Sequence, residues 1–140
     1  MRIHIKGGRL IDPANALEGQ HDLYLADGQV AAIDTAPDGF SADQVIDATD
    51  QIVIPGLVDL NARLREPGQE HKATIASETR AAAVGGITTL CVQPDTDPII
   101  DTPAVSELIH HRARQAGYAR VVTLGALTMQ LQGEHLSEMK

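Results

Sequence analysis

Polar and apolar residues alternate with a period of two through the first fifty residues, which predicts short strands rather than helices. The Asp27-Gly28 pair separates two such segments, and this pair accepts the positive φ angles of a type I′ turn, so the two segments should form a β-hairpin. Residues 1–54 are therefore expected to form a small all-β unit of antiparallel strands. The strands are predicted at residues 2–6, 9–11, 22–26, 29–33, 45–47 and 51–54.

The pattern changes after Pro55-Gly56, where longer apolar runs alternate with segments of helical period. Helices are predicted over residues 74–84 and 102–115, because Gly85-Gly86 and Gly117 follow them as stop signals and Thr102-Pro103 opens the second. The order β-α-β-α-β indicates parallel strands joined by right-handed crossovers. The strands of this part are predicted at residues 57–60, 87–92 and 120–125.

Two fold classes use such units, the doubly wound sheet and the (β/α)8 barrel. No Gly-x-Gly-x-x-Gly motif follows the strand at residues 57–60, so dinucleotide binding has little support. A barrel needs about 250 residues, and the part from Gly56 onward supplies fewer than three of its eight units. We expect residues 55–140 to be the N-terminal portion of a barrel, with its first three strands and two helices, and the chain to be incomplete as given.

Composition narrows the range of partners. The chain has 11 Lys and Arg residues against 19 Asp and Glu residues, and its net charge of −8 offers no electrostatic surface for nucleic acid or an anionic membrane. The single Cys91 excludes an internal disulfide, and no apolar stretch is long enough to cross a membrane. These features predict a cytoplasmic protein.

Residues 57–65 carry the chemical information, because polar and apolar side chains alternate there and successive strand residues point to opposite faces. In a parallel α/β fold, polar residues at the carboxyl end of a strand mark a site. The alternative interpretation is a solvated edge strand. One face carries Val58, Leu60, Ala62 and Leu64, and the other carries Asp59, Asn61, Arg63 and Arg65.

Several segments in one colinear order resemble the dihydroorotases of the amidohydrolase superfamily, over about the first third of that family's usual chain. The resemblance implies a (β/α)8 barrel preceded by a small β unit that forms part of a composite sandwich. The segments are Pro55-Gly56-Leu57-Val58-Asp59, Leu64-Arg65-Glu66-Pro67-Gly68-Gln69-Glu70-His71-Lys72, Ala81 to Thr89, Gln93-Pro94-Asp95-Thr96-Asp97-Pro98 and Gly125-Ala126-Leu127-Thr128.

The departures from the family pattern concern the metal. The family binds its metal through His-x-His on the first barrel strand, and Asn61 and Arg63 occupy these two positions here. A guanidinium has no lone pair to donate, and placing it about 4 Å from a divalent ion would cost about 8 kcal/mol at an effective dielectric constant of 20. The adjacent His110 and His111 cannot chelate one ion together. We therefore expect no metal and no other cofactor.

A second departure lies on the loop at residues 93–98. Asp95 replaces the family's Asn that helps to hold the substrate carboxylate, whereas Arg65 matches the family's other carboxylate-holding residue. Both positions are interpreted as vestigial, with no substrate bound. Since Arg63 and Asp95 are new charges of opposite sign at the ends of neighbouring strands, we expect them to pair, with Arg65 as a second candidate donor. Asn61 and Asp59 are expected to satisfy the remaining donors.

The resemblance implies a catalytically inactive dihydroorotase-like protein. Such a chain would serve as a non-catalytic structural subunit that partners the catalytic chain of aspartate carbamoyltransferase in a hetero-oligomer, within de novo pyrimidine biosynthesis, and would also self-associate. One alternative is an active dihydroorotase or related cyclic amidohydrolase with an altered metal site. Another is a small-molecule binder that uses Arg65. Metal analysis separates the first alternative, and ligand titration with Arg65→Ala separates the second.

Overall fold

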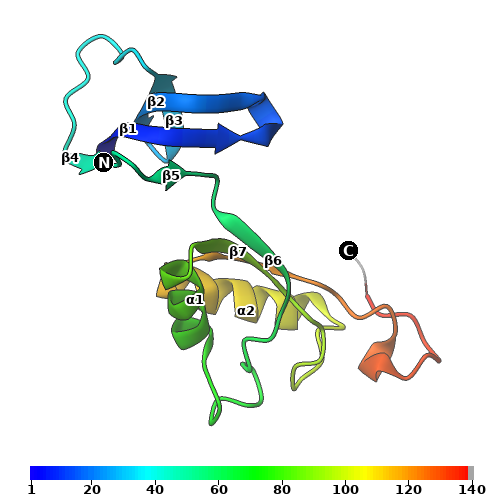
Figure 1. The fold of residues 1–140 in the computed structure, drawn as a ribbon. Helices are drawn as coiled ribbons and strands as arrows, with labels where there is room; N and C mark the ends of the chain where they lie inside the picture. Colours follow the sequence, from blue (N-terminus) through cyan, green and yellow to red (C-terminus); the bar gives the residue numbers. More distant parts are fainter. Residues whose placement is uncertain (139–140) are drawn as a thin grey trace. The chain divides into compact units, whose positions relative to one another are not determined.

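The computed structural model describes residues 1–138 and divides into two compact units, Met1–Pro55 and the part from Gly56 onward (Figure 1). The first unit contains only strands and one short 3-10 helix, Pro13–Asn15, whereas the second alternates strands with helices. In the described part of the chain, no helix is long and apolar enough to span a membrane.

The first unit is a five-stranded sheet in which β1 lies centrally and pairs with three other strands. The β1–β2 and β2–β3 pairs are antiparallel, whereas β4 and β5 both run parallel to β1. The prediction of antiparallel strands throughout is therefore wrong for β4 and β5, because the connection after β3 returns the chain to the start of β1. The strands are β1 (Arg2–Asp12), β2 (Leu17–Ala26), β3 (Gln29–Ile33), β4 (Gln44–Asp47) and β5 (Ile52–Val53).

Two local features shape this sheet. The turn between β2 and β3 has φ angles of 52° at Asp27 and 75° at Gly28, which confirms the predicted type I′ hairpin. The two strands predicted at residues 2–6 and 9–11 are one strand, β1, with a bulge between Ile5 and Gly8. A Cβ atom at Gly8 would lie 2.5 Å from Val53 Cγ2, so only glycine fits the bulge against β5.

One part of the sheet is lined by apolar side chains around a hollow of about 590 Å³. Val30 and Ile54 at its margin are exposed, so the apolar lining is not fully covered within this unit. That observation fits a unit that forms part of a larger sandwich, which stays a prediction. The apolar lining residues are Ile5, Leu10, Leu17, Leu23, Leu25, Val30, Ile33, Val53, Ile54 and Pro55.

The second unit is a parallel three-stranded sheet in the order β6-β7-β8, with α1 and α2 packed against it (Figure 1). This arrangement confirms the predicted start of a (β/α)8 barrel, with three strands and two helices. The strand predicted at residues 57–60 extends to Ala62, whereas the strand predicted at residues 120–125 ends earlier, at Thr123. The elements are β6 (Leu57–Ala62), α1 (Ile75–Val84), β7 (Ile87–Val92), α2 (Pro103–Ala116) and β8 (Arg120–Thr123).

The ends of the two helices follow the predicted signals, with one exception. Thr74 caps α1 by accepting from the Ser77 backbone N–H, while Ser77 Oγ accepts from the Thr74 N–H. Gly117, with φ of 70°, ends α2. Thr102 and Pro103 open α2 as predicted, but Thr102 makes no side-chain capping hydrogen bond at the N-cap position.

The core of the second unit lies between the sheet and the two helices. Ile75 begins α1 inside this core, and Ile109 on α2 is fully buried. Leu108, next to Ile109 in the chain, is 38% exposed. Burial of these apolar side chains supplies the main driving force for docking the helices. The buried members are Ala62, Leu64, Ile75, Leu90, Val92, Ile100, Ile109, Ala113 and Val121.

A polar network stiffens the bulged end of the first unit. The Asp22 carboxylate is 2.9 Å from His4 Nε2 and accepts from the Gly7 N–H in the bulge at 2.8 Å. The hydrogen bond from His4, and after it that from Gly7, lower the pKa of Asp22 below its usual value of 3.8. The His4 ring also stacks on Tyr24 at 4.5 Å between centroids.

Asp22→Asn is expected to destabilise the first unit at pH 7 but not in acid. Because folding lowers the pKa of Asp22, its stabilisation is present above the unfolded-state value of 3.8 and is lost as the pH falls through the lower folded-state value. Urea midpoints followed by circular dichroism should differ between wild type and variant at pH 7 and approach each other as the pH is lowered below 3.8. Asp27→Asn in the hairpin turn removes the same charge and is the control; an equal shift in this control would contradict the assignment.

Candidate functional site

The candidate site lies where β6 and β7 end, because the carboxyl ends of parallel strands meet at one edge of the sheet. Arg63 follows the last residue of β6, and Asp95 lies three residues beyond the end of β7. Arg63 Nε donates to Asp95 Oδ2 at 2.7 Å, which confirms the predicted pair. The two side chains are 49% and 46% exposed, so the pair contributes about 0.2–1 kcal/mol rather than the larger energy of a buried pair.

The prediction that Asn61 and Asp59 satisfy the remaining donors of this pair is wrong. Asp59 Oδ1 accepts from the Asn61 backbone N–H at 2.9 Å, so this carboxylate makes its hydrogen bond within β6. Within residues 1–138, neither Asn61 nor Asp59 makes a hydrogen bond to Arg63. The guanidinium is therefore satisfied by Asp95 and by solvent, because it is half exposed.

Arg65 also lies apart from Asp95. Its φ of 64° is left-handed, and its carbonyl accepts from the Gln69 N–H at 2.8 Å, so the backbone has already turned out of the strand. Among the described residues, no ion pair links Arg65 to Asp95, and its predicted role as a second donor is wrong. The space that both arginines border is a cavity of about 20 Å³, the size of a water molecule. Its polar lining residues are Arg63, Arg65, Gln69, Gln93, Asp95 and Thr96.

A metal ion does not fit the donors at this edge. Arg63 has no lone pair, its charge repels a cation, and it already occupies the Asp95 carboxylate. Asn61 offers a single amide oxygen, a weak donor beside imidazole. In the part of the chain that the structure describes, no three His, Cys, Asp or Glu side chains converge as a metal-binding group.

The histidines are distributed away from the site. His4 and His21 pair with Asp22 and Asp34 in the first unit. His110 lies on α2 with Nε2 3.4 Å from Thr123 Oγ1, and His71 is exposed in the loop after β6. None of these rings approaches Arg63 within hydrogen-bond distance in the described chain.

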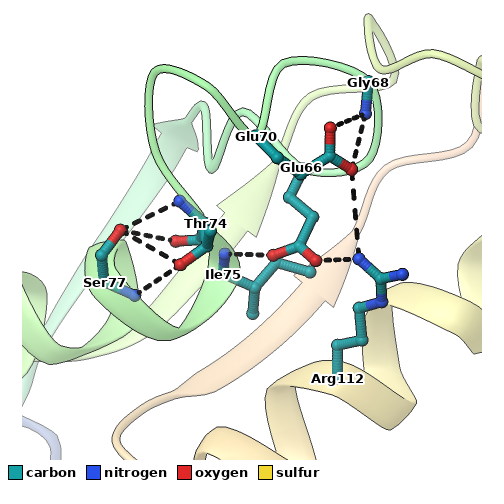
Figure 2. Close-up of polar contacts among 7 residues, drawn as sticks. All are labelled: Glu66, Gly68, Glu70, Thr74, Ile75, Ser77 and Arg112. Atoms are coloured by element: carbon teal, nitrogen blue, oxygen red, sulfur yellow. Dashed lines mark hydrogen bonds and ion pairs between the residues drawn. The ribbon is translucent and has the colours of Figure 1, made fainter.

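Sequence reasoning missed Glu66, whose side chain is only 10% exposed. Its Oε2 accepts from the Ile75 N–H at the start of α1 at 2.6 Å, and its Oε1 binds the Arg112 guanidinium of α2 (Figure 2). A carboxylate at a helix N-terminus is stabilised by the unpaired N–H groups there. One buried charge therefore connects the loop after β6 to both helices. The sequence could indicate this buried contact only in part, because Arg112 lies 46 residues from Glu66 in the chain.

Gly68 allows the loop after β6 to lie directly against the loop after β7. Gly68 has φ of 104°, and a Cβ atom there would lie 2.5 Å from Asp97 Cβ and 2.6 Å from the Asp97 carbonyl oxygen. The Asp97 N–H donates to the Pro67 carbonyl at 3.1 Å, and the Gly68 N–H donates to the Glu70 carboxylate (Figure 2). The backbones of the two loops thus touch, and this contact fixes the position of the segment that carries Asp95.

The parallel β-α-β-α-β unit with charged residues at its carboxyl edge defines the beginning of an amidohydrolase-type barrel. A family model described as Dihydro-orotase-like matches residues 50–140. The chain belongs to this dihydroorotase-like family. The match includes the strand that carries Asn61 and Arg63 and the loop that carries Asp95.

Relatives of known name agree with this assignment. The chain is 52% identical over 139 residues to a "Dihydroorotase-like protein" of Pseudomonas aeruginosa, covering 99% of this chain and 33% of that protein. It is 43% identical over 136 residues to a "Dihydroorotase" of Anaeromyxobacter sp. strain K, covering 97% of this chain and 31% of that protein. The chain therefore spans about a third of the length of the curated relatives it matches.

Solved structures show the same fold. An L-hydantoinase (dihydropyrimidinase) from Arthrobacter aurescens superposes with a TM-score of 0.74 at 27% identity, covering 90% of this chain and 28% of the hydantoinase. A D-hydantoinase superposes with a TM-score of 0.63 at 24% identity, covering 88% of this chain and 26% of that chain, and its likeness concerns the fold alone.

Glu66→Gln is expected to lower the free energy of unfolding of the second unit by about 2 kcal/mol. The amide would lose the charge that Arg112 and the Ile75 N–H both contact, and its NH2 group would face a donor. Urea unfolding at pH 7 measures the loss. Glu107→Gln removes a carboxylate from an exposed pair with Arg114 and should cost far less than Glu66→Gln. Equal losses in the two variants would contradict a special role for Glu66.

Gly68→Ala is expected to destabilise the second unit by about 2–4 kcal/mol, because the new methyl group overlaps the Asp97 backbone in addition to straining a positive φ angle. Gly133→Ala is the matched control. Gly133 also has a positive φ, 80°, but a Cβ atom there meets nothing within 4 Å, so the loss should be about 1 kcal/mol. Thermal unfolding of both variants compares strain with overlap, and a loss at Gly68 no larger than that at Gly133 would rule out the overlap.

Proposed function

We propose that this chain belongs to a catalytically inactive dihydroorotase-like protein, a cytoplasmic structural subunit that supports an aspartate carbamoyltransferase complex in pyrimidine biosynthesis. The observation that carries the proposal is the Arg63–Asp95 ion pair, 2.7 Å long, at two positions where the family resemblance implies a metal ligand and a substrate contact. Self-association of the protein is part of the same proposal.

The chemistry of the site supports inactivity. Hydrolysis of a cyclic amide at neutral pH needs an activated water, which a metal ion provides by lowering the pKa of the water it binds. Arg63 cannot hold such an ion and cannot itself act as a base, because its guanidinium stays protonated. The Asp95 carboxylate has no N–H group to donate, so it cannot hold a substrate carboxylate as the family's Asn would.

The retained scaffold supports a structural role. The loops after β6 and β7 form the mouth of the barrel, and local contacts hold them in a defined position. These contacts are the bonds of Glu66 to Arg112 and to the start of α1, and the contact between Gly68 and Asp97. These contacts need no bound ion or substrate, so the loops keep their shape in a chain that has a structural role only. The 52% identity to proteins named dihydroorotase-like is consistent with this interpretation.

The second candidate is an active dihydroorotase or related cyclic amidohydrolase whose metal ligands lie outside residues 1–140. Two observations favour it: relatives named dihydroorotase are 38–44% identical, and Arg65 keeps the position that matches the family's carboxylate-holding residue. In this case the metal would have to bind without any ligand from the position that Arg63 occupies.

Purified full-length protein is expected to show no dihydroorotate hydrolysis, to contain less than about 0.1 zinc per chain after dialysis, and to co-elute with the catalytic chain of aspartate carbamoyltransferase on gel filtration. Elemental analysis, a hydrolysis assay and elution profiles with and without the partner measure these outcomes. A relative named dihydroorotase serves as the positive control for the assay. Chelator-sensitive hydrolysis would support the second candidate, and separate elution of the two chains would contradict the structural role.

A further inference from the structure

The ion pair at the mouth joins two loops whose sequence positions are 32 residues apart. We propose that the Arg63 guanidinium is a built-in cation that performs the cross-linking role of a bound metal ion, so that an ion pair and not a metal holds the ends of β6 and β7 together. The inference rests on the family assignment given above, and it is independent of any partner chain.

The strand pairing beneath the pair shows why a cross-link is useful there. The β6–β7 ladder pairs Asp59 with Leu90 and resumes only at Ala62 and Val92, so β6 carries one extra residue in this interval. Such a bulge interrupts the backbone hydrogen bonds at the point where the strands reach the mouth. Beyond it, the loops can be held only by contacts outside the ladder.

Two kinds of contact restore the connection. The Gln93 N–H donates to the Ala62 carbonyl at 3.3 Å, and Gln93 Nε2 donates to the Leu60 carbonyl at 3.2 Å. The Arg63–Asp95 pair then adds a charged bond immediately beyond them. A bound metal ion joins strands in the same way, by drawing ligands from different segments to one centre.

The guanidinium also makes the mouth refractory to metal. Its charge is permanent, and the Asp95 carboxylate that could have bound a cation already accepts its hydrogen bond. An ion pair that is half exposed is weakened by salt and unaffected by a chelator. A metal cross-link behaves in the opposite way, since a chelator removes it and moderate salt does not.

Hydrogen exchange of the full-length protein tests the proposal through peptides covering residues 93–100. Arg63→Ala and Asp95→Asn should each speed exchange in this segment about two- to fivefold, and the double variant should exchange no faster than either single variant. Adding 0.5 M salt, on the order of several times physiological ionic strength, should bring wild type close to the variants. EDTA should have no effect on wild type.

Arg65→Ala is the matched control. It removes the same charge two residues along the chain from Arg63, and the Arg65 side chain makes no ion pair with Asp95 in the described chain. Its exchange in residues 93–100 should equal that of wild type. Exchange that rises with EDTA, bound zinc in wild-type protein, or additive effects of the two single variants would each overturn the proposal. Failure to bind aspartate carbamoyltransferase would overturn the proposed function and leave these exchange results unchanged.

Discussion

The buried carboxylate of Glu66 is the interaction on which the barrel mouth depends. A carboxylate that is nine-tenths buried is tolerated only where donors surround it. The Ile75 N–H supplies one donor, and Arg112 supplies the other. The loop can therefore take this position only when α1 and α2 are both docked on the sheet. Helix packing and loop position are thus one cooperative unit, and Arg65, adjacent to Glu66 in sequence, is placed by it.

The residues that support the loops and the residues that the family resemblance places in the chemistry are different sets. Glu66 and Gly68 act through burial and close backbone contact, which the fold requires whatever ion or substrate is present. Asn61, Arg63 and Asp95 lie at the solvent end of the strands, where Asn61 is exposed and the other two side chains are about half exposed. Substitution there costs little stability, so the chemistry of the mouth can change without loss of the fold.

Local signals predicted the elements, whereas distant partners decided the rest. The Asp27-Gly28 turn and the glycine at the end of α2 follow from backbone conformational preferences, and the structure confirms both. The direction of β4 and the burial of Glu66 depend on segments far away in sequence, which no local pattern encodes. The Arg63–Asp95 pair was predictable because parallel strand ends converge and the two substitutions carry opposite charges.

The modest strength of the Arg63–Asp95 pair is consistent with the contacts beside it. Gln93 already bridges to β6, and the Gly68–Asp97 contact already holds the loop after β7 against the loop after β6. The pair has only to restrain the short segment between these contacts, for which a half-exposed ion pair is sufficient. A metal ion would bind that segment far more tightly and would also activate water. For the structural role proposed above, an ion pair would supply the restraint without the reactivity.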